Sequence, residues 1–252
     1  MSAGLVAVGE VLLDVVAPQA EGRVAHVPVS VRAGGVPVNV AVAAARAGVQ
    51  AAVVGRVGRD AAAAAIEHAL AAAGVTALLQ RDETLPTGTF VRLGGRIAAD
   101  RGASAALRAG DVPALEARAV VVSGYALLHE DTRPAARAAL ERARAEHVAV
   151  VAPAAGLMAT VEPDEFHRLA AGATALFLNA AEARHLTAAG PRAACAELGR
   201  RYAVACVTAG ADGAFASIDG ALRHLPAPPA LLDTTGAGDA LAGTLLAQLV
   251  GA

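Results

Sequence analysis

The chain has 252 residues, with 21 basic and 23 acidic side chains and a formal net charge of −2. This length suits one large domain or two small ones with a sizeable core, and the near-neutral balance argues against a nucleic-acid partner. No uninterrupted apolar run approaches about 18 residues, so we expect no membrane association. The first 16 residues include Glu10 and Asp14 and lack a basic start, so we do not expect a signal peptide.

The composition excludes several kinds of enzyme. The chain has 70 alanines, two asparagines and no lysine, because every basic residue is arginine. Without lysine there can be no Walker A loop, Schiff-base enzyme or lysine base. No G-x-S-x-G hydrolase elbow is present, and Cys195 and Cys206 lack the spacing of a metal site. Two ordinary thiols favour a reduced, cytoplasmic setting.

Apolar runs alternate with alanine-rich helical stretches along the chain. Helices are predicted over Val38–Ala47 and Ala61–Ala73, each followed by a glycine that accepts a left-handed helix end. Strands are predicted near Leu5–Val8, Ala51–Val57, Ala119–Ser123, Val148–Val151, Ala175–Leu178 and Ala203–Thr208. This alternation predicts an α/β fold with a mainly parallel sheet covered on both faces.

Two segments depart from this pattern. Val11–Val31 and Thr87–Asp100 contain short alternating runs with turn residues at Gly22 and at Gly94-Gly95. They predict antiparallel strands of a small accessory sheet, or lid, beside a single domain that spans residues 1–252. The exposed strands of such a sheet favour pairing with another subunit, so we expect a homodimer through the lid.

The string Asp233-Thr-Thr-Gly-Ala-Gly-Asp239-Ala240 precedes an apolar helical run, Leu241–Val250. Glycines that open a helix leave backbone N–H groups free to bind an anion, and the helix dipole adds to the attraction. Asp239 would lie beside a phosphate bound there and could accept a proton from an attacking hydroxyl. We expect the free N–H groups and the dipole at the start of this helix to keep Asp239 ionised. The alternative is a turn in which Thr234 or Thr235 caps the helix.

Two further strings contain the two asparagines. Gly34-Gly35 opens the helix that contains Asn39, where the glycines allow close approach of a ligand and the amide can bind hydroxyls. The alternative is a glycine turn with a solvated asparagine. Asn179 and Glu182 follow the strand that ends at Leu178, where they could meet the Mg²⁺ and phosphates of a nucleotide. The alternative is a plain capping box.

In order along the chain, these strings resemble the ribokinase-type (PfkB) family of carbohydrate kinases. The resemblance begins with Val6–Glu10 and Asp14 and continues through Gly34–Asn39 and Gly55–Asp60. It also includes Thr87-Gly88, Arg101-Gly102-Ala103, Asn179 with Glu182, the Thr208–Gly213 loop and the final octet. It implies a ribokinase-like three-layer sandwich with a small β lid.

The resemblance also implies the roles of individual residues. Catalysis would use Asp239 as the base and the anion hole of Gly236, Ala237 and Gly238. The residues implied for the sugar are Asp14, Gly34, Gly35, Asn39 and Arg101. The residues implied for Mg-ATP are Asn179, Glu182, Thr208, Gly210, Gly213 and Thr235, with Glu182 near the metal.

Three features depart from the family pattern. The chain ends at Ala252, one helix after the octet, whereas the family usually continues and completes an adenine pocket and a monovalent-cation site. We therefore expect ATP to be held mainly through its phosphates and Mg²⁺, and expect part of Leu245–Val250 to form an exposed apolar patch. Ala152-Pro153 stands where relatives often have Asp-Pro. Any cationic contact to ATP must come from arginine.

The resemblance implies an ATP-dependent kinase that phosphorylates a hydroxyl of a small sugar or sugar acid, with Mg²⁺ as cofactor and, in the family, a monovalent cation. The G-G-V-P-V-N-V-A string is closer to fructokinase and ketodeoxygluconate-kinase relatives than to ribokinase. A nucleoside kinase of the same family is one alternative. A non-catalytic sugar-binding protein with an incomplete nucleotide site is the other.

Overall fold

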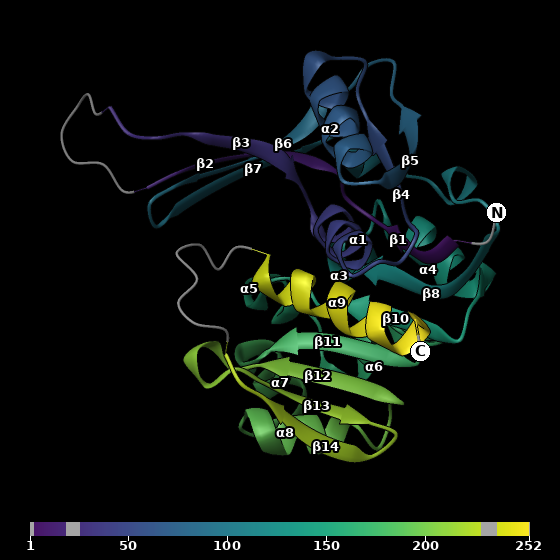
Figure 1. The fold of residues 1–252 in the computed structure, drawn as a ribbon, viewed down its shortest axis with the longest axis vertical. Coiled ribbons are helices and arrows are strands. Elements are labelled where there is room, and N and C mark those ends of the chain that lie inside the picture. The colour runs from purple at the N-terminus through teal and green to yellow at the C-terminus, as the bar shows by residue number, and fades with distance from the viewer. Residues whose placement is uncertain (1–2, 19–25, 228–235, 252) are drawn as a thin grey trace.

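The computed structural model describes residues 3–18, 26–227 and 236–251 and contains a large sheet, a small sheet and helices on both faces of the large one (Figure 1). The strands of the large sheet are β1 (Ala3–Val8), β4 (Ala51–Val57), β5 (Val75–Arg81), β8 (Leu115–Ser123), β9 (Ala143–Arg144), β10 (His147–Val151), β11 (Ala175–Asn179), β12 (Val204–Thr208), β13 (Ala214–Ile218) and β14 (Ala221–Leu225). Their order is β14-β13-β12-β11-β10-β8-β1-β4-β5, with β9 beside β8. All pairings are parallel except those of β13 with β12 and β14.

Alternating side chains of the central strands enter two separate cores, as the continuous apolar runs predict. In β1, Val6 and Val8 belong to one core, and Leu5 and Ala7 belong to the other. The first core is covered by α3 (Gly124–Leu128), α4 (Arg133–Arg142), α5 (Ala155–Met158), α6 (Pro163–Leu169), α7 (Ala180–Thr187) and α8 (Pro191–Leu198). The second is covered by α1 (Val36–Arg46), α2 (Ala61–Ala72) and α9 (Ala237–Gly251). The fold is therefore the expected three-layer α/β sandwich.

The small sheet projects from this body (Figure 1). It has the order β3-β2-β6-β7 and consists of β2 (Leu12–Ala17), β3 (Ser30–Gly34), β6 (Thr87–Leu93) and β7 (Arg96–Gly102). The outer pairings are antiparallel, but the central pair β2–β6 is parallel, because the two strands come from separate hairpins rather than from one meander. Short 3₁₀ turns follow it at η1 (Ala103–Ala106) and η2 (Ala109–Asp111), and a third, η3 (Gly210–Asp212), follows β12.

The C-terminal helix α9 is better covered than the sequence suggested. Leu245, Leu246 and Val250 are buried against α1 and the sheet, and Leu249 is half-buried. The expectation of an exposed apolar patch over Leu245–Val250 was therefore wrong, because the apolar side chains of this part of α9 pack within the second core. None of the helices in the described ranges is both long enough and apolar enough to cross a bilayer.

Candidate active site

Two adjoining cavities lie at the carboxyl ends of the central strands. The smaller, of about 580 Å³, is enclosed by α1, α3, α9 and the small sheet. The larger, of about 1240 Å³, lies beside the ends of β10, β11 and β12 and the start of α9. Asp239 and Ala152 line both cavities. The carboxylate of Asp239 is thus placed between two compartments, each large enough for a small molecule.

Asp239 is held by an asparagine from the other glycine-rich string. Asn39 Nδ2 donates a hydrogen bond of 2.9 Å to Asp239 Oδ2, so Asn39 is not simply solvated. Burial raises the pKa of Asp239 to about 7; the Asn39 bond lowers it, and Glu10 and Asp14 raise it further. The expectation that the helix start keeps Asp239 fully ionised was therefore wrong, because desolvation and two neighbouring carboxylates outweigh the dipole.

The start of α9 faces the larger cavity. The Ala240 amide donates to Gly236 O over 2.8 Å, which leaves the preceding amides of the first turn without intrahelical partners. Ala237 and Gly238 line the larger cavity, and a Cβ built at Gly238 meets no atom within 4 Å. Gly236 lines the smaller cavity. These amides can bind an anion at the boundary of the cavities, whereas Thr235, also predicted here, lies outside the described residues.

The predicted sugar residues divide into those that line the smaller cavity and one that supports it. Asp14, Gly35, Asn39 and Arg101 line it. Gly34 does not: a Cβ there would collide with the Asp14 carboxylate, so this glycine makes room for the aspartate. Gly35 has φ +97°, and a Cβ there would collide with Glu10 O. The Gly-Gly pair is thus explained by close packing beside the cavity.

Arg101 is already engaged by a carboxylate. Its Nη1 and Nη2 donate to the two oxygens of Asp131 at 2.7 and 2.9 Å, and Nη2 also donates to Thr132 Oγ1 at 3.2 Å. This bidentate pair fixes the guanidinium at the cavity wall and compensates its charge.

Asn179 and Glu182 form a capping box at the start of α7, and they also line the larger cavity. Asn179 N donates to Glu182 Oε2 at 2.8 Å, and Asn179 Oδ1 accepts from Glu182 N at 3.1 Å. Burial raises the pKa of Glu182 to about 7, and the charge of Asp239 contributes to the rise. The capping interpretation is therefore correct for this pair, and the nucleotide interpretation stays a prediction that the position beside the larger cavity allows. Thr208, Gly210 and Gly213 also line that cavity, and Thr208 is the register partner of Asn179 in the neighbouring strand.

No group of three His, Cys, Asp or Glu side chains suited to a metal occurs within the described ranges. A single buried carboxylate such as Glu182, beside a cavity for phosphates, fits Mg²⁺, which retains several waters and takes its other ligands from phosphate. The described donors are thus compatible with Mg²⁺ carried by a nucleotide.

The sequence did not single out three further side chains of the smaller cavity, namely Tyr125, His129 and Ser104. Ser104 is buried; its hydroxyl donates to Val11 O at 2.9 Å and accepts from Val11 N at 3.0 Å. These residues belong to no motif in the sequence, and only the folding of the chain brings them to the cavity. Ser104 directly follows the Arg101-Gly102-Ala103 string, but a serine in that position gives no sequence signal of its own.

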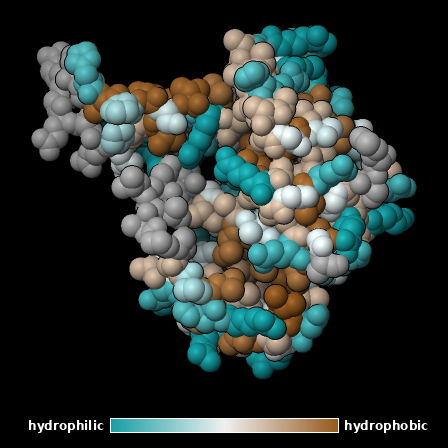
Figure 2. Space-filling view, in the orientation of Figure 1, coloured by the Kyte–Doolittle hydropathy of each residue, from teal (hydrophilic) through white to brown (hydrophobic). Residues whose placement is uncertain are grey.

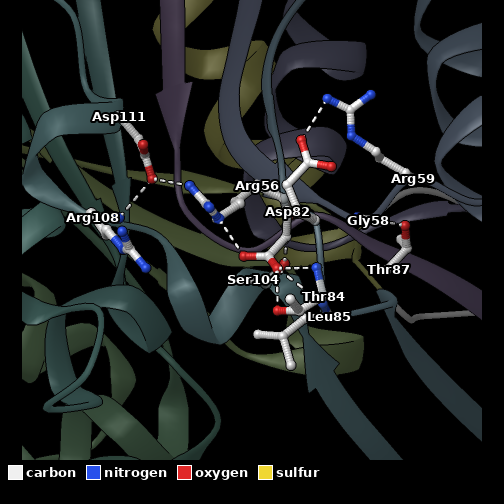
Figure 3. Close-up of polar contacts among 11 residues, drawn as sticks. Arg56, Gly58, Arg59, Asp82, Thr84, Leu85, Thr87, Ser104, Arg108 and Asp111 are labelled. Atoms are coloured by element: carbon white, nitrogen blue, oxygen red, sulfur yellow. Dashed lines mark hydrogen bonds and ion pairs between the residues drawn. The ribbon is translucent and has the colours of Figure 1, made fainter.

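A polar cluster beside Ser104 supports the base of the small sheet (Figure 3). Arg56 Nε donates to Asp82 at 2.9 Å and its Nη1 donates to Asp111 at 3.0 Å. Amide hydrogen bonds from Leu85 and Thr84, followed by Arg56, hold the pKa of Asp82 well below its usual range. The Gly55–Asp60 string of the resemblance is thus a structural one. It fixes the chain where β6 begins, because Gly58 N donates to Thr87 Oγ1 at 3.0 Å and Thr87 N donates to Asp60 Oδ2 at 2.7 Å.

Comparison with known proteins shows which family and which solved structures this chain is similar to. The model of the pfkB family carbohydrate kinases matches residues 2–251. Among solved structures, adenosine kinase from Sinorhizobium meliloti is similar over 100% of this chain and 89% of its own, with 20% identity and a TM-score of 0.87. Putative ribokinase II from E. coli, solved with ATP and Mg²⁺, is similar over 99% and 86%, with 19% identity and a TM-score of 0.83.

A third structure is somewhat closer in sequence. Aminoimidazole riboside kinase from Salmonella enterica, complexed with aminoimidazole riboside and an ATP analogue, is 26% identical over 98% of this chain and 85% of its own, with a TM-score of 0.80. No curated protein matches the chain by sequence. The fold is that of the ribokinase-like kinases. Because the family model covers nearly the whole chain, the chain belongs to the pfkB family of carbohydrate kinases.

Proposed function

We propose that this kinase transfers a phosphoryl group from ATP to a hydroxyl of a small sugar or sugar acid. The observation that carries the proposal is the position of Asp239, which lines both the smaller and the larger cavity. In the proposal the smaller cavity takes the hydroxyl-bearing substrate and the larger takes the nucleotide. Family membership supports a kinase, and the similar E. coli structure was solved with ATP and Mg²⁺.

The proposed proton acceptor is Asp239. Its ionised carboxylate would take the proton of the substrate hydroxyl as the oxygen attacks, and Asn39 would keep the carboxylate oriented. Phosphoryl transfer has a loose transition state, so a base with a pKa of about 7 is sufficient. When bound, ATP supplies the phosphoryl group and Mg²⁺ neutralises phosphate charge.

The remaining residues would position the two molecules. The amides of Gly236, Ala237 and Gly238 at the start of α9 would stabilise charge on the transferring group, where they are already oriented. Glu182 and Asn179 would hold waters of the Mg²⁺ ion, and the Thr208–Gly213 loop would border the nucleotide. Water must be kept from the reacting phosphate, and closure of the small sheet over the smaller cavity would serve that purpose.

A panel assay tests the proposal. Release of ADP from Mg-ATP would be measured with neutral sugars, sugar acids and nucleosides, with and without KCl to test the monovalent cation. We expect release that depends on one class of acceptor and on Mg²⁺. Acceptor-independent release would indicate hydrolysis of ATP and contradict the kinase assignment. No release with any acceptor despite ATP binding would also contradict it and would favour a non-catalytic sugar-binding protein.

A nucleoside acceptor is the second candidate. It is favoured by two of the similar structures, an adenosine kinase and an aminoimidazole riboside kinase, and by the size of the smaller cavity, about 580 Å³. The same panel separates the two candidates, because a nucleoside kinase would prefer adenosine or aminoimidazole riboside to every free sugar.

A further inference from the structure

Arg101 of the small sheet and Asp131 of the main body form an ion pair at the wall of the smaller cavity. Arg101 belongs to β7, and Asp131 lies in the turn between α3 and α4. Arg101 lines the cavity, whereas Asp131 is not among its lining residues. The aspartate therefore holds, from outside the lining, a guanidinium that a molecule in the cavity can reach.

The pair leaves part of the guanidinium available to a ligand. Arg101 Nη1 donates to Asp131 Oδ2 at 2.7 Å, and Nη2 donates to Asp131 Oδ1 at 2.9 Å. Nη2 also donates to Thr132 Oγ1 at 3.2 Å. An arginine has five N–H donors, so Nε–H and one Nη1–H have no acceptor among the described residues. These two donors can bind a hydroxyl or carbonyl oxygen of a molecule in the cavity.

The turn that contains Asp131 is fixed by its own hydrogen bonds. Thr132 N and Arg133 N both donate to His129 O, at 3.3 and 2.9 Å. Thr132 is only 2% exposed, and its hydroxyl donates to Ala126 O at 3.0 Å. Because the turn cannot shift without breaking these bonds, it presents the Asp131 carboxylate at one position.

The backbone of Arg101 is fixed as well. A Cβ at Gly88 would lie 2.4 Å from Arg101 O, so β6 and β7 approach closely here. The next residue, Gly102, has φ +46°, and Ala103 N donates to Pro86 O at 2.7 Å. The ion pair thus joins two segments whose backbones are already placed. A long side chain that is held in advance in this way loses little further freedom when it binds a ligand.

The charges of the cavity show what Asp131 prevents. Glu10 and Asp14 line the same cavity as Arg101. Burial raises the pKa of Glu10, and the charge of Arg101 is among the effects that lower it, so the two groups interact. A guanidinium released from Asp131 would be attracted toward these carboxylates and would occupy space that a ligand needs.

We propose that Asp131 is a positioning residue for the acceptor substrate: it holds Arg101 at the cavity wall, where the remaining N–H donors of Arg101 bind an oxygen of the acceptor. The inference rests on the proposed function, in which the smaller cavity takes the acceptor, and it adds a residue from outside the cavity lining. Asp131 then affects acceptor binding through Arg101 alone and leaves the transfer step unchanged.

Steady-state kinetics separate binding from transfer. We would measure KM and kcat for fructose, ribose and adenosine at saturating Mg-ATP. Asp131→Asn keeps the size but replaces one accepting oxygen with an amide that donates, so the paired contact is lost. We expect KM for the best acceptor to rise about threefold to tenfold, with kcat within about twofold of wild type. Asp131→Glu keeps the charge and should reverse part of the rise in KM.

A double-mutant cycle shows whether Asp131 acts through Arg101. In an Arg101→Ala protein, Asp131→Asn should change KM by about twofold or less, because the side chain that Asp131 positions is gone. Effects of the two substitutions that simply multiply would overturn the inference.

Glu146→Gln is the matched control. Both oxygens of Glu146 accept from one arginine, Arg118, at 3.1 and 3.5 Å. Glu146 directly precedes β10, at the opposite end of the strand from the cavities, and lines neither of them. The control should leave KM unchanged. An equal rise in KM in Glu146→Gln would show that loss of any such ion pair is sufficient, and would overturn the inference.

Calorimetry without nucleotide distinguishes failure of the inference from failure of the proposed function. Weaker binding of fructose, ribose or adenosine by Asp131→Asn, with binding by Glu146→Gln unchanged, would support the inference even if none of the three were phosphorylated, a result that would contradict the proposed function alone. Phosphorylation with an unchanged KM in Asp131→Asn would overturn the inference and leave the kinase assignment intact. A wild-type protein that binds none of the three would also overturn it, as would a variant that loses stability without losing affinity.

Discussion

Asn39 and Asp239 are 200 positions apart in the chain and are joined by one hydrogen bond of 2.9 Å, from Nδ2 to Oδ2. The bond connects the first helix after the Gly-Gly string to the first turn of the last helix. It depends on the tight packing of α1 against α9, where a Cβ at Gly243 would collide with Val40 O. The orientation of the proposed base is therefore set by how closely two distant helices approach.

Replacing the proposed base tests its role most directly. Asp239→Asn keeps the shape and removes the proton acceptor, so we expect kcat to fall by about 10² to 10⁴-fold. Sugar binding, measured by calorimetry, should change little, because the other residues of the smaller cavity remain. A variant that keeps near wild-type kcat would show that Asp239 is not the base.

The pH profile tests the electrostatics of the same carboxylate. With the pKa of Asp239 at about 7, kcat/KM should fall about tenfold per pH unit below that value, as the base becomes protonated. Asn39→Ala removes the donor that lowers this pKa, so the acid limb should move to higher pH. If both proteins had the same acid limb, Asn39 would not tune the base.

The architecture and the central site residues could be predicted because they depend on local patterns. Apolar runs gave the strand β4 at its observed bounds, Ala51–Val57, and glycine strings marked the helix starts that carry Asn39 and Asp239. The raised pKa of Asp239 could not be predicted, since it arises first from burial within the folded chain and then from Glu10 and Asp14, which are distant in sequence. The same holds for Gly34, whose neighbour across the strands is the Asp14 carboxylate.

Close helix packing makes Gly243 a sensitive position. Because an added Cβ would collide with Val40 O, Gly243→Ala should push α9 away from α1 and destabilise the protein by about 1–3 kcal/mol. It should also lower kcat by disturbing the Asn39–Asp239 bond. Gly251→Ala in the same helix, where a Cβ meets nothing within 4 Å, is the control and should change stability little. Denaturant unfolding measures both; equal effects would contradict the packing argument.

The two raised carboxyl pKa values make the free protein sensitive to pH. Asp239 and Glu182 hold protons up to about pH 7 in the folded state, whereas the unfolded chain loses them near their ordinary values of 3.8 and 4.5. Between these limits the folded state binds more protons, so stability should decrease as pH rises toward 7. The Tm of the ligand-free protein measured from pH 5 to 8 should decrease, and it should decrease less in Asp239→Asn. A Tm that rises from pH 5 to pH 7 would contradict the raised pKa values of Asp239 and Glu182.

The small sheet should mediate association of two copies of this chain. Hydrophobic side chains gather along it in Figure 2, and Val31 and Leu93 are 59% and 56% exposed. Its outer strands, β3 and β7, also have free edges within the described residues, and such strands favour pairing with another chain.

We expect light scattering to give about twice the mass of the 24.8 kDa chain, and Val31→Arg or Leu93→Arg to give the monomer. Leu78→Arg, at an exposed leucine of β5 in the large sheet, is the control and should leave the dimer intact. A wild-type protein that is monomeric at all concentrations, or a dimer broken only by Leu78→Arg, would exclude the small sheet as the interface.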